Sequence, residues 1–181
     1  MRALARALFT LALVTGLALG AIVLYERYAA PPPETPRLVP QAEQIDRIIV
    51  EKSARRLTAL RDGEVVARYP IALGFAPEGD KVREGDGKTP EGVFRINRRN
   101  PASAYHLSLG IDYPQPDDRA RAQAGGYSAG GDIFIHGQPN GIGRIATIPT
   151  DWTAGCIAVS DAAIEALWAL APNGTLVEIR P

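Results

Sequence analysis

Apolar residues recur at every second position through much of the chain after residue 40, and this period restricts the fold that the chain can form. In IDRIIVEK, Ile48 and Val50 share one face. The longest alternating run is EVVARYPIAL, in which the residues on one face are Val65, Ala67, Tyr69, Ile71 and Leu73. Because successive side chains of a β-strand point to opposite faces, this alternation predicts strands. Asp62-Gly63, just before that run, is typical of a hairpin turn.

Further strands are predicted for GVFRI, GGDIFIHG and TLVEI, the last of which follows the turn signal Pro172-Asn173-Gly174. Only one segment after residue 40 has the pattern of a helix, SDAAIEALWAL, whose apolar residues fall on one face. Ser160 or Asp161 can cap its first turn. Many short strands with one late helix predict a mostly β sandwich or barrel.

The N-terminal region differs in character from the rest of the chain. Arg2 and Arg6 precede Ala7 to Tyr25, an uncharged apolar stretch close to the roughly 20 residues that span a bilayer. Ala18-Leu19-Gly20 offers small residues for cleavage, so residues 1–28 are predicted to be either a signal peptide or a membrane anchor. The preceding basic residues favour an N-terminus inside the cell, which places the remainder in the periplasm or cell envelope.

Residues 29–40, AAPPPETPRLVP, contain five prolines and are predicted to be an extended tether. Residues 41–181 then form a single domain that is long enough to bury its own core. The whole chain has 20 basic and 20 acidic residues, and this balance argues against nucleic acid as a partner. A single cysteine, Cys156, excludes an intrachain disulfide.

The segment GDGKTPEG, residues 85–92, ends like a phosphate-binding loop at Gly87-Lys88-Thr89. That motif also requires a glycine at the position of Val82 and a helix after the threonine. Pro90 and Gly92 instead break the chain before a predicted strand. The segment is therefore predicted to be a glycine-rich loop that enters a strand.

Cys156 and His136 are the residues best suited to chemistry. Each alone is more often structural, as a small buried thiol or a satisfied imidazole. Together, an imidazole can take the proton of a thiol whose pKa is about 8.5, which gives a nucleophilic thiolate. Gly155 lets the backbone turn sharply, so that its N–H and that of Cys156 can serve as an oxyanion hole. One cysteine and two histidines at scattered spacing give little support to a zinc site.

These motifs resemble the L,D-transpeptidase catalytic domain family, whose signature is His-Gly followed downstream by Ser/Thr-x-Gly-Cys. Here the signature reads His136-Gly137 and Thr153-Ala154-Gly155-Cys156. The resemblance continues in order from IIVEKSARRLTALRDGEVVARYPIALG through GDGKTPEGVFRI, HLSLGIDYP and GGDIFIHG to GCIAVSD. It implies an L,D-transpeptidase-like, mostly β fold for the catalytic domain over residues 41–181.

The resemblance also implies cysteine acyl transfer on peptidoglycan stem tetrapeptides. The cysteine attacks the carbonyl of the third, diamino residue and releases D-alanine, and an amine then resolves the thioester to give a 3,3 cross-link or a wall-attached protein. Cys156 would be the nucleophile, His136 the base and then the acid, and the Gly137 carbonyl would orient the imidazole. No metal or cofactor is implied. Hydrolysis of the same thioester by a carboxypeptidase or amidase, and a non-catalytic cell-wall binding domain, remain as alternatives.

Two positions depart from the family pattern. Many members carry a histidine or arginine where Ala154 stands, and an arginine where Ala158 stands. Arg144, between the two motifs, is the candidate to supply the missing charge to a substrate. The other candidate substrate-binding residues, each of which could instead be structural, are Thr153, Trp152, Tyr105 and His106.

Overall fold

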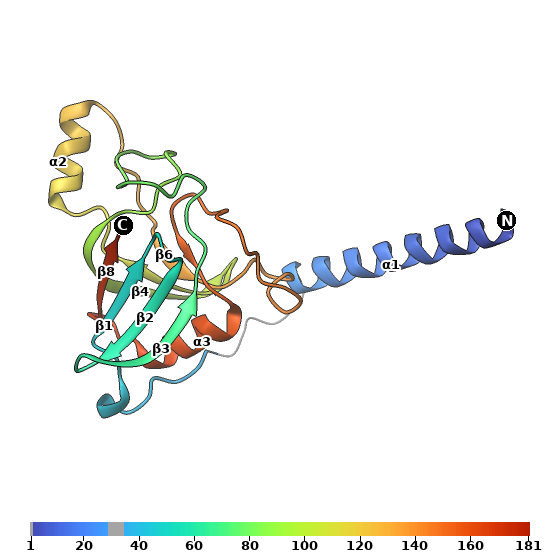
Figure 1. The fold of residues 1–181 in the computed structure, drawn as a ribbon, viewed down its shortest axis with the longest axis horizontal. Helices are drawn as coiled ribbons and strands as arrows, with labels where there is room; N and C mark the ends of the chain where they lie inside the picture. The colour runs from blue at the N-terminus through green and yellow to red at the C-terminus, as the bar shows by residue number, and fades with distance from the viewer. Residues whose placement is uncertain (1, 29–34) are drawn as a thin grey trace.

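The computed structural model describes residues 2–28 and 35–181, so the predicted tether, residues 29–40, lies partly outside the described residues (Figure 1). The helical elements are α1 (Arg2–Tyr28), η1 (Gln41–Glu43), α2 (Pro116–Gly125) and α3 (Asp161–Leu170). The strands are β1 (Arg47–Glu51), β2 (Arg56–Arg61), β3 (Glu64–Pro70), β4 (Gly92–Ser103), β5 (His106–Ile111), β6 (Phe134–His136), β7 (Ile157–Ala158) and β8 (Leu176–Arg180).

The strands form one eight-stranded sheet in the order β3-β2-β1-β8-β4-β5-β6-β7. β4 pairs with β8 along its first residues and with β5 along the rest, and a register shift after Ile96 lets the long strand bend between the two partners. The two ends of the sheet meet through Ala72, which follows β3 and exchanges backbone hydrogen bonds of 2.9 and 2.8 Å with Ala158 in β7. The sheet therefore closes on itself, within the predicted mostly β class.

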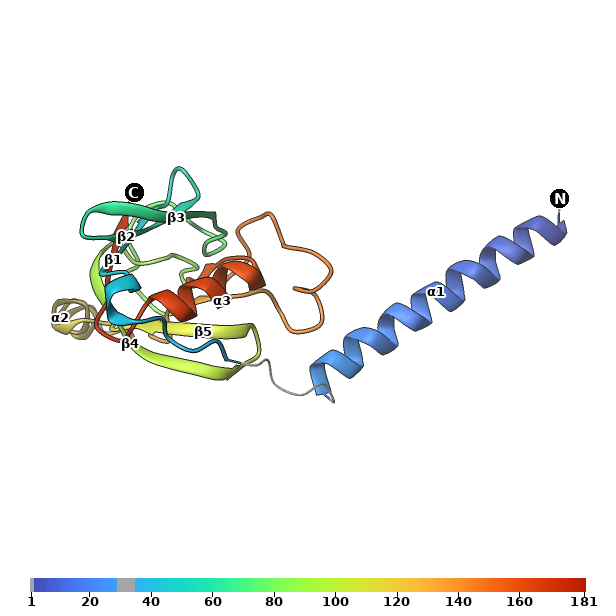
Figure 2. The same ribbon diagram turned by 90° about the horizontal axis from the view of Figure 1, so that it is seen from below.

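The helix predicted from SDAAIEALWAL is α3, which packs against β5 and β6 (Figure 2). The Ser160 hydroxyl accepts a hydrogen bond of 3.2 Å from the Ala163 N–H, as expected for an N-cap. Ile164, Leu167 and Trp168 are all buried. The apolar stripe of the sequence is thus the face that joins the core.

The prediction of one alternating strand from Val65 to Leu73 is wrong in detail. The strand contains a bulge and ends before Leu73. Ala59 is paired with Ala67 but Leu60 with Val65, and this bulge leaves Val65 exposed. β3 ends at Pro70, so Leu73 is buried by the loop that follows the strand.

A second helix in the domain, α2, was missed by the prediction of one late helix. Its first turn carries Pro116, and the Asp118 carboxylate accepts a hydrogen bond of 2.9 Å from the Gln115 N–H. Gly126 ends it in the left-handed conformation, at φ 71°. Ala122 is its only buried residue, so the helix has no apolar stripe for a periodicity to detect.

The N-terminal apolar stretch forms α1. Its segment Leu4–Tyr25 is long and apolar enough to cross a membrane, and none of it is buried within the protein. This agrees with a signal or anchor over residues 1–28, and the choice between the two stays a prediction.

Candidate active site

The pairing of β6 with β7 brings Cys156 and His136 together. The two strands are parallel, with Ile135 opposite Ile157 and His136 opposite Ala158. Both isoleucines are fully buried in the core. Because side chains alternate along a strand, His136 and Cys156 share the other face, on neighbouring strands and two positions apart along them. The register therefore places both side chains on the face opposite the two buried isoleucines.

His136 is held in one orientation and one tautomer. Its side chain is buried, and Nδ1 lies 2.7 Å from the carbonyl oxygen of Gly137. Since a carbonyl only accepts, Nδ1 carries the proton and Nε2 has a free lone pair. The rings of Tyr105 and Trp152 flank the imidazole, with centroids 4.6 and 5.7 Å away. Burial lowers the pKa of His136, against a smaller opposing effect of the bond to Gly137, so the imidazole is neutral at neutral pH.

The thiol of Cys156 is also neutral at rest. Burial is the main cause of a raised pKa, partly offset by a hydrogen bond from the backbone of Phe134, while the carboxylate of Asp132 raises the pKa further. The Sγ atom donates a hydrogen bond of 3.4 Å to the carbonyl oxygen of Asp132. Burial therefore favours the uncharged form of both groups.

We expect the pH dependence of alkylation to show this neutral resting state. Because a raised pKa of Cys156 keeps the thiol protonated, the rate with iodoacetamide should rise with pH to a midpoint above the ordinary thiol pKa of about 8.5. The measurement is the mass of the full chain against time at each pH. A midpoint near or below pH 7 would contradict the neutral pair.

Thr153 fixes the loop that carries the thiol. Its Oγ1 accepts a hydrogen bond of 3.1 Å from the Gly155 N–H and donates one of 2.7 Å to the Cys156 carbonyl oxygen. Its own backbone pairs with the segment after β3, through Leu73 and Phe75. The expectation that the Gly155 N–H faces a substrate oxygen therefore differs from the structure, and the Cys156 N–H remains as the candidate oxyanion donor.

Gly155 is required where the loop meets the segment GDGKTPEG. Its φ is +134°, and a Cβ at this position would lie 2.6 Å from the carbonyl oxygen of Lys88. That segment is held by Asp86, whose carboxylate accepts the Lys88 N–H at 3.0 Å and pairs with Lys81 at 2.8 Å. The predicted glycine-rich loop thus supports the nucleophile loop, and it leads into β4 as expected.

We expect Gly155→Ala to lower acyl transfer by about 100-fold, because the new methyl group must displace either the Lys88 carbonyl or the nucleophile loop. Gly63→Ala is the matched control, since Gly63 also has a positive φ but open space around it. The control should lose stability without losing activity. Rates and melting temperatures of both variants check this, and equal rates would contradict the proposed role of the contact.

The other candidate substrate-binding residues lie in different parts of the structure. Tyr105 and Trp152 lie with His136, and their own ring centroids are 5.6 Å apart. The indole Nε1 of Trp152 is buried without a hydrogen-bond partner among the described residues. His106 instead contacts α3, with Nε2 2.7 Å from a carboxylate oxygen of Glu165. Arg144 is exposed in the loop between β6 and β7.

Sequence analysis missed Asp151, which positions the start of the nucleophile loop. Its carboxylate accepts the Leu73 N–H at 2.8 Å and pairs with the Arg55 guanidinium at 2.7 Å. It lies five residues before the cysteine, but no local pattern shows that its partners come from the turn before β2 and the segment after β3.

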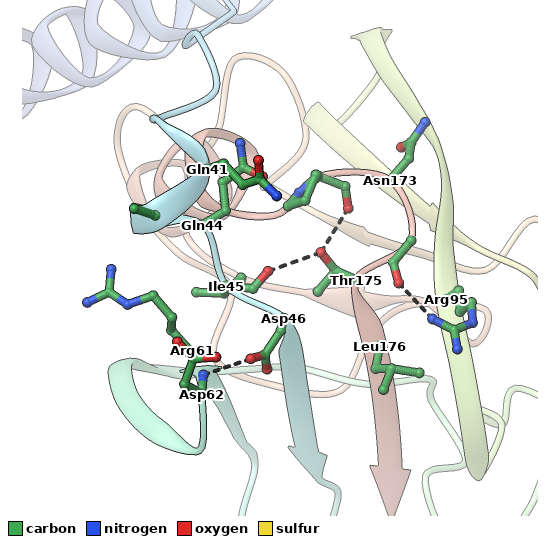
Figure 3. Close-up of a pocket in the computed structure, with 13 residues that line it drawn as sticks. Gln41, Gln44, Ile45, Asp46, Arg61, Asp62, Arg95, Asn173, Thr175 and Leu176 are labelled. Atoms are coloured by element: carbon green, nitrogen blue, oxygen red, sulfur yellow. Dashed lines mark hydrogen bonds between the residues drawn. The ribbon is translucent and has the colours of Figure 1, made fainter.

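A separate cavity of about 570 Å³ contains none of the candidate residues (Figure 3). It lies where β1 and β8 begin, and several of the residues that line it are hydrogen-bonded to one another. Thr175 Oγ1 donates to the Pro172 carbonyl at 2.8 Å, and the Arg95 guanidinium donates to the Gly174 carbonyl at 3.0 Å. Arg61 also lines this cavity.

The architecture is thus a closed β-sheet with a cysteine and a histidine on one face of two adjoining strands. Residues 45–179 match the family model of the L,D-transpeptidase catalytic domain, YkuD, so the chain belongs to this family. The resemblance found in the sequence is confirmed.

Similar proteins support the assignment. The chain is 33% identical over 85 residues to the putative L,D-transpeptidase YafK of Escherichia coli K12, a match that covers 46% of this chain and 32% of that protein. The matched part thus spans about a third of that curated relative. The helical cell shape determining protein Pgp2 of Campylobacter jejuni, as a K307A mutant, is 25% identical with a TM-score of 0.58, over 81% of this chain and 50% of that one. Bd1075 of Bdellovibrio bacteriovorus is 25% identical with a TM-score of 0.55, over 83% and 53%.

Proposed function

We propose that this protein is a peptidoglycan L,D-transpeptidase that acts through a thioester on Cys156. The observation that supports the proposal is the register of β6 and β7, which puts Cys156, just before β7, on the same face as an imidazole whose Nδ1 is bonded to the Gly137 carbonyl. Membership of the L,D-transpeptidase catalytic domain family supports the substrate class, stem tetrapeptides of the wall.

In the proposed mechanism, each group has one step. As Sγ of Cys156 attacks the carbonyl of the third residue, Nε2 of His136 takes the thiol proton, and the Cys156 N–H donates to the developing oxyanion. The intermediate then expels the amine of D-alanine, which takes the proton from Nε2, and a thioester remains. An acceptor amine attacks this thioester and gives its proton to Nε2, and the thiolate regains that proton as it leaves.

The N-terminal region suits an enzyme that works on the wall. We propose that α1 serves as a signal or anchor, and that the domain acts in the periplasm or cell envelope. If α1 is retained, the proline-rich segment over residues 29–40 would let the domain reach from the membrane toward its substrate. A role in cell shape is part of this proposal, because the Campylobacter jejuni neighbour Pgp2 is described as a helical cell shape determining protein.

The test is mass spectrometry of the full chain in detergent with stem tetrapeptides and an amine acceptor. Transpeptidation predicts loss of D-alanine, a covalent adduct on Cys156 and a cross-linked product. An adduct with only free tripeptide would assign hydrolysis, as in a carboxypeptidase or amidase. The absence of both adduct and product would contradict the proposal and favour a non-catalytic wall-binding domain.

A further inference from the structure

The peptide group between Gly137 and Gln138 joins the imidazole of His136 to a carboxylate. Its carbonyl oxygen lies 2.7 Å from Nδ1 of His136, and its N–H donates a hydrogen bond of 2.8 Å to Oδ1 of Asp161. The carbonyl and the N–H of a trans peptide point in opposite directions, so the two partners lie on opposite sides of the peptide. The imidazole, the peptide and the carboxylate therefore form one hydrogen-bonded chain.

Asp161 is available for this contact because it does not cap the helix that it begins. Ser160 accepts the Ala163 N–H as the N-cap of α3, and Asp161 is the first helical residue. Two glycines leave room for the carboxylate. A Cβ at Gly137 would lie 2.6 Å from Oδ1, and a Cβ at Gly143 would overlap Oδ2. The carboxylate therefore reaches the backbone of the loop that follows β6.

The same peptide is held from both sides by other hydrogen bonds. The side chain of Gln138 is fully buried, its Nε2 donates to the Val159 carbonyl at 2.6 Å, and its Oε1 accepts the Ile148 N–H at 2.9 Å. The N–H of Gly137 donates to the Leu107 carbonyl at 3.2 Å. These neutral partners fix the plane of the peptide, and Asp161 adds an ionisable group to its N–H.

An ionised carboxylate in this position affects the imidazole in two ways. Accepting the N–H polarises the peptide, which makes its carbonyl a stronger acceptor for the proton on Nδ1. The negative charge also stabilises a protonated His136, because attraction between charges is weakly screened in a buried region. Burial raises the pKa of Asp161, whereas the hydrogen bond from Gln138 and the N-terminal end of α3 both favour the ionised form.

We propose that Asp161 is a positioning residue that acts on His136 through the peptide between Gly137 and Gln138. The inference rests on the proposed function, in which His136 gains and then loses a proton at Nε2. The carboxylate keeps the other proton on Nδ1 and favours the imidazolium that forms when the thiol is deprotonated. It does so across the peptide, without belonging to the substrate-binding surface.

Other titratable groups also face this hydrogen-bonded chain. His106 lowers the pKa of Asp161 and Glu165 raises it. At the other end, the ring centroid of Tyr105 lies 4.6 Å from that of His136, and Cys156 shares the same face of the sheet. Glu165 bonds to His106 instead of the peptide, so it provides a control for the loss of a charge from α3.

The test measures the hydrogen bond at Nδ1 by NMR of the full chain in detergent, with ¹⁵N-labelled histidine. The chain contains two histidines, and His106→Asn in a parallel sample assigns their signals. Asp161→Asn keeps an oxygen that can accept the Gln138 N–H but removes the charge. We expect the Nδ1 proton of His136 to move upfield and to exchange faster with water, because its carbonyl acceptor is weaker.

The same substitution should lower kcat for D-alanine release about tenfold with little change in KM, since Asp161 stabilises the imidazolium and does not bind substrate. The acid limb of the rate should move to lower pH, because loss of a nearby negative charge lowers the pKa of His136 further. Glu165→Gln is the matched control. It should leave the Nδ1 signal and the acid limb unchanged and alter kcat by about twofold or less.

Gly143→Ala is a second variant that keeps the charge and moves it. Its methyl group would overlap Oδ2, so the carboxylate must shift away from the peptide. We expect the same upfield movement of the Nδ1 proton as in Asp161→Asn. Melting temperatures are measured for every variant, and Gly143→Ala provides the test if Asp161→Asn does not fold.

An unchanged Nδ1 proton in the folded variants would overturn the proposal, and an equal fall in kcat for Glu165→Gln would also overturn it. A lower melting temperature with no change at Nδ1 would assign Asp161 a structural role alone. The NMR measurement needs no turnover, so it separates this proposal from the proposed function. A shifted Nδ1 proton in a protein whose wild type releases no D-alanine would support the link from Asp161 to His136 and contradict acyl transfer.

Discussion

Substitution of Cys156 by serine is expected to reduce release of D-alanine from stem tetrapeptides by about 10⁴-fold or more. The serine hydroxyl can still donate to the Asp132 carbonyl, so the loop keeps the hydrogen bond that the thiol makes. A hydroxyl is much less acidic than a thiol, and an imidazole whose pKa is lowered by burial is a weak base for it. The measurement is the rate of D-alanine release beside the melting temperature of each protein.

The melting temperature is the control for the serine variant, and it should match that of the wild type. A variant that retains more than about a tenth of the activity would show that the thiol is not the nucleophile. A large fall in melting temperature would instead show that the thiol contributes mainly to packing.

His136→Asn is expected to reduce the same rate by about 10²- to 10⁴-fold, because Nε2 is lost. The asparagine amide can still donate to the Gly137 carbonyl in place of Nδ1, which preserves the local hydrogen bond. The wild type should lose activity as pH falls through the lowered pKa of His136, below the ordinary value of about 6.5. The variant should lack this acid limb, and its rate should rise with pH as thiolate forms.

His106→Asn is the matched control for the second histidine. Asparagine tolerates the positive φ of 64° at this position, and the contact with Glu165 is partly exposed. We expect a loss of about threefold or less, with the acid limb retained. Equal losses in the two variants would assign the effect of His136→Asn to packing, and a rise in KM alone for His106→Asn would assign a substrate contact to His106.

Apolar periodicity and capping residues predicted those helices and strands whose formation depends on neighbouring residues in the sequence. The α3 helix has an apolar stripe and a serine cap, and both features are visible in the sequence. The α2 helix has a proline and a capping carboxylate but no stripe, so no periodicity indicated it. The bulge opposite Ala59 depends on which strand pairs with which, and alternation within β3 carries no information about that.

Local sequence patterns also predict only part of the candidate active site. The motifs around His136 and Cys156 predict two reactive groups, because the residue types themselves carry the chemistry, and this assignment stays a prediction. The contacts of Asp151 with Arg55 and Leu73 join residues that are distant in the chain, and only the fold reveals them. The bond from the Gly155 N–H to Thr153 likewise depends on the three-dimensional turn of the loop.

The neutral pair of thiol and imidazole also affects how the protein survives while it has no substrate. Oxidants and foreign disulfides react with thiolates, and the raised pKa of Cys156 keeps the thiolate fraction low. In an oxidising compartment, a lone cysteine of this kind resists sulfenic acid formation and unwanted mixed disulfides. Under the proposed mechanism, the thiol reacts only when a bound acyl group accepts the sulfur as His136 removes the proton. If Cys156 is the nucleophile that we propose, the burial that slows a general reagent also protects it between turnovers.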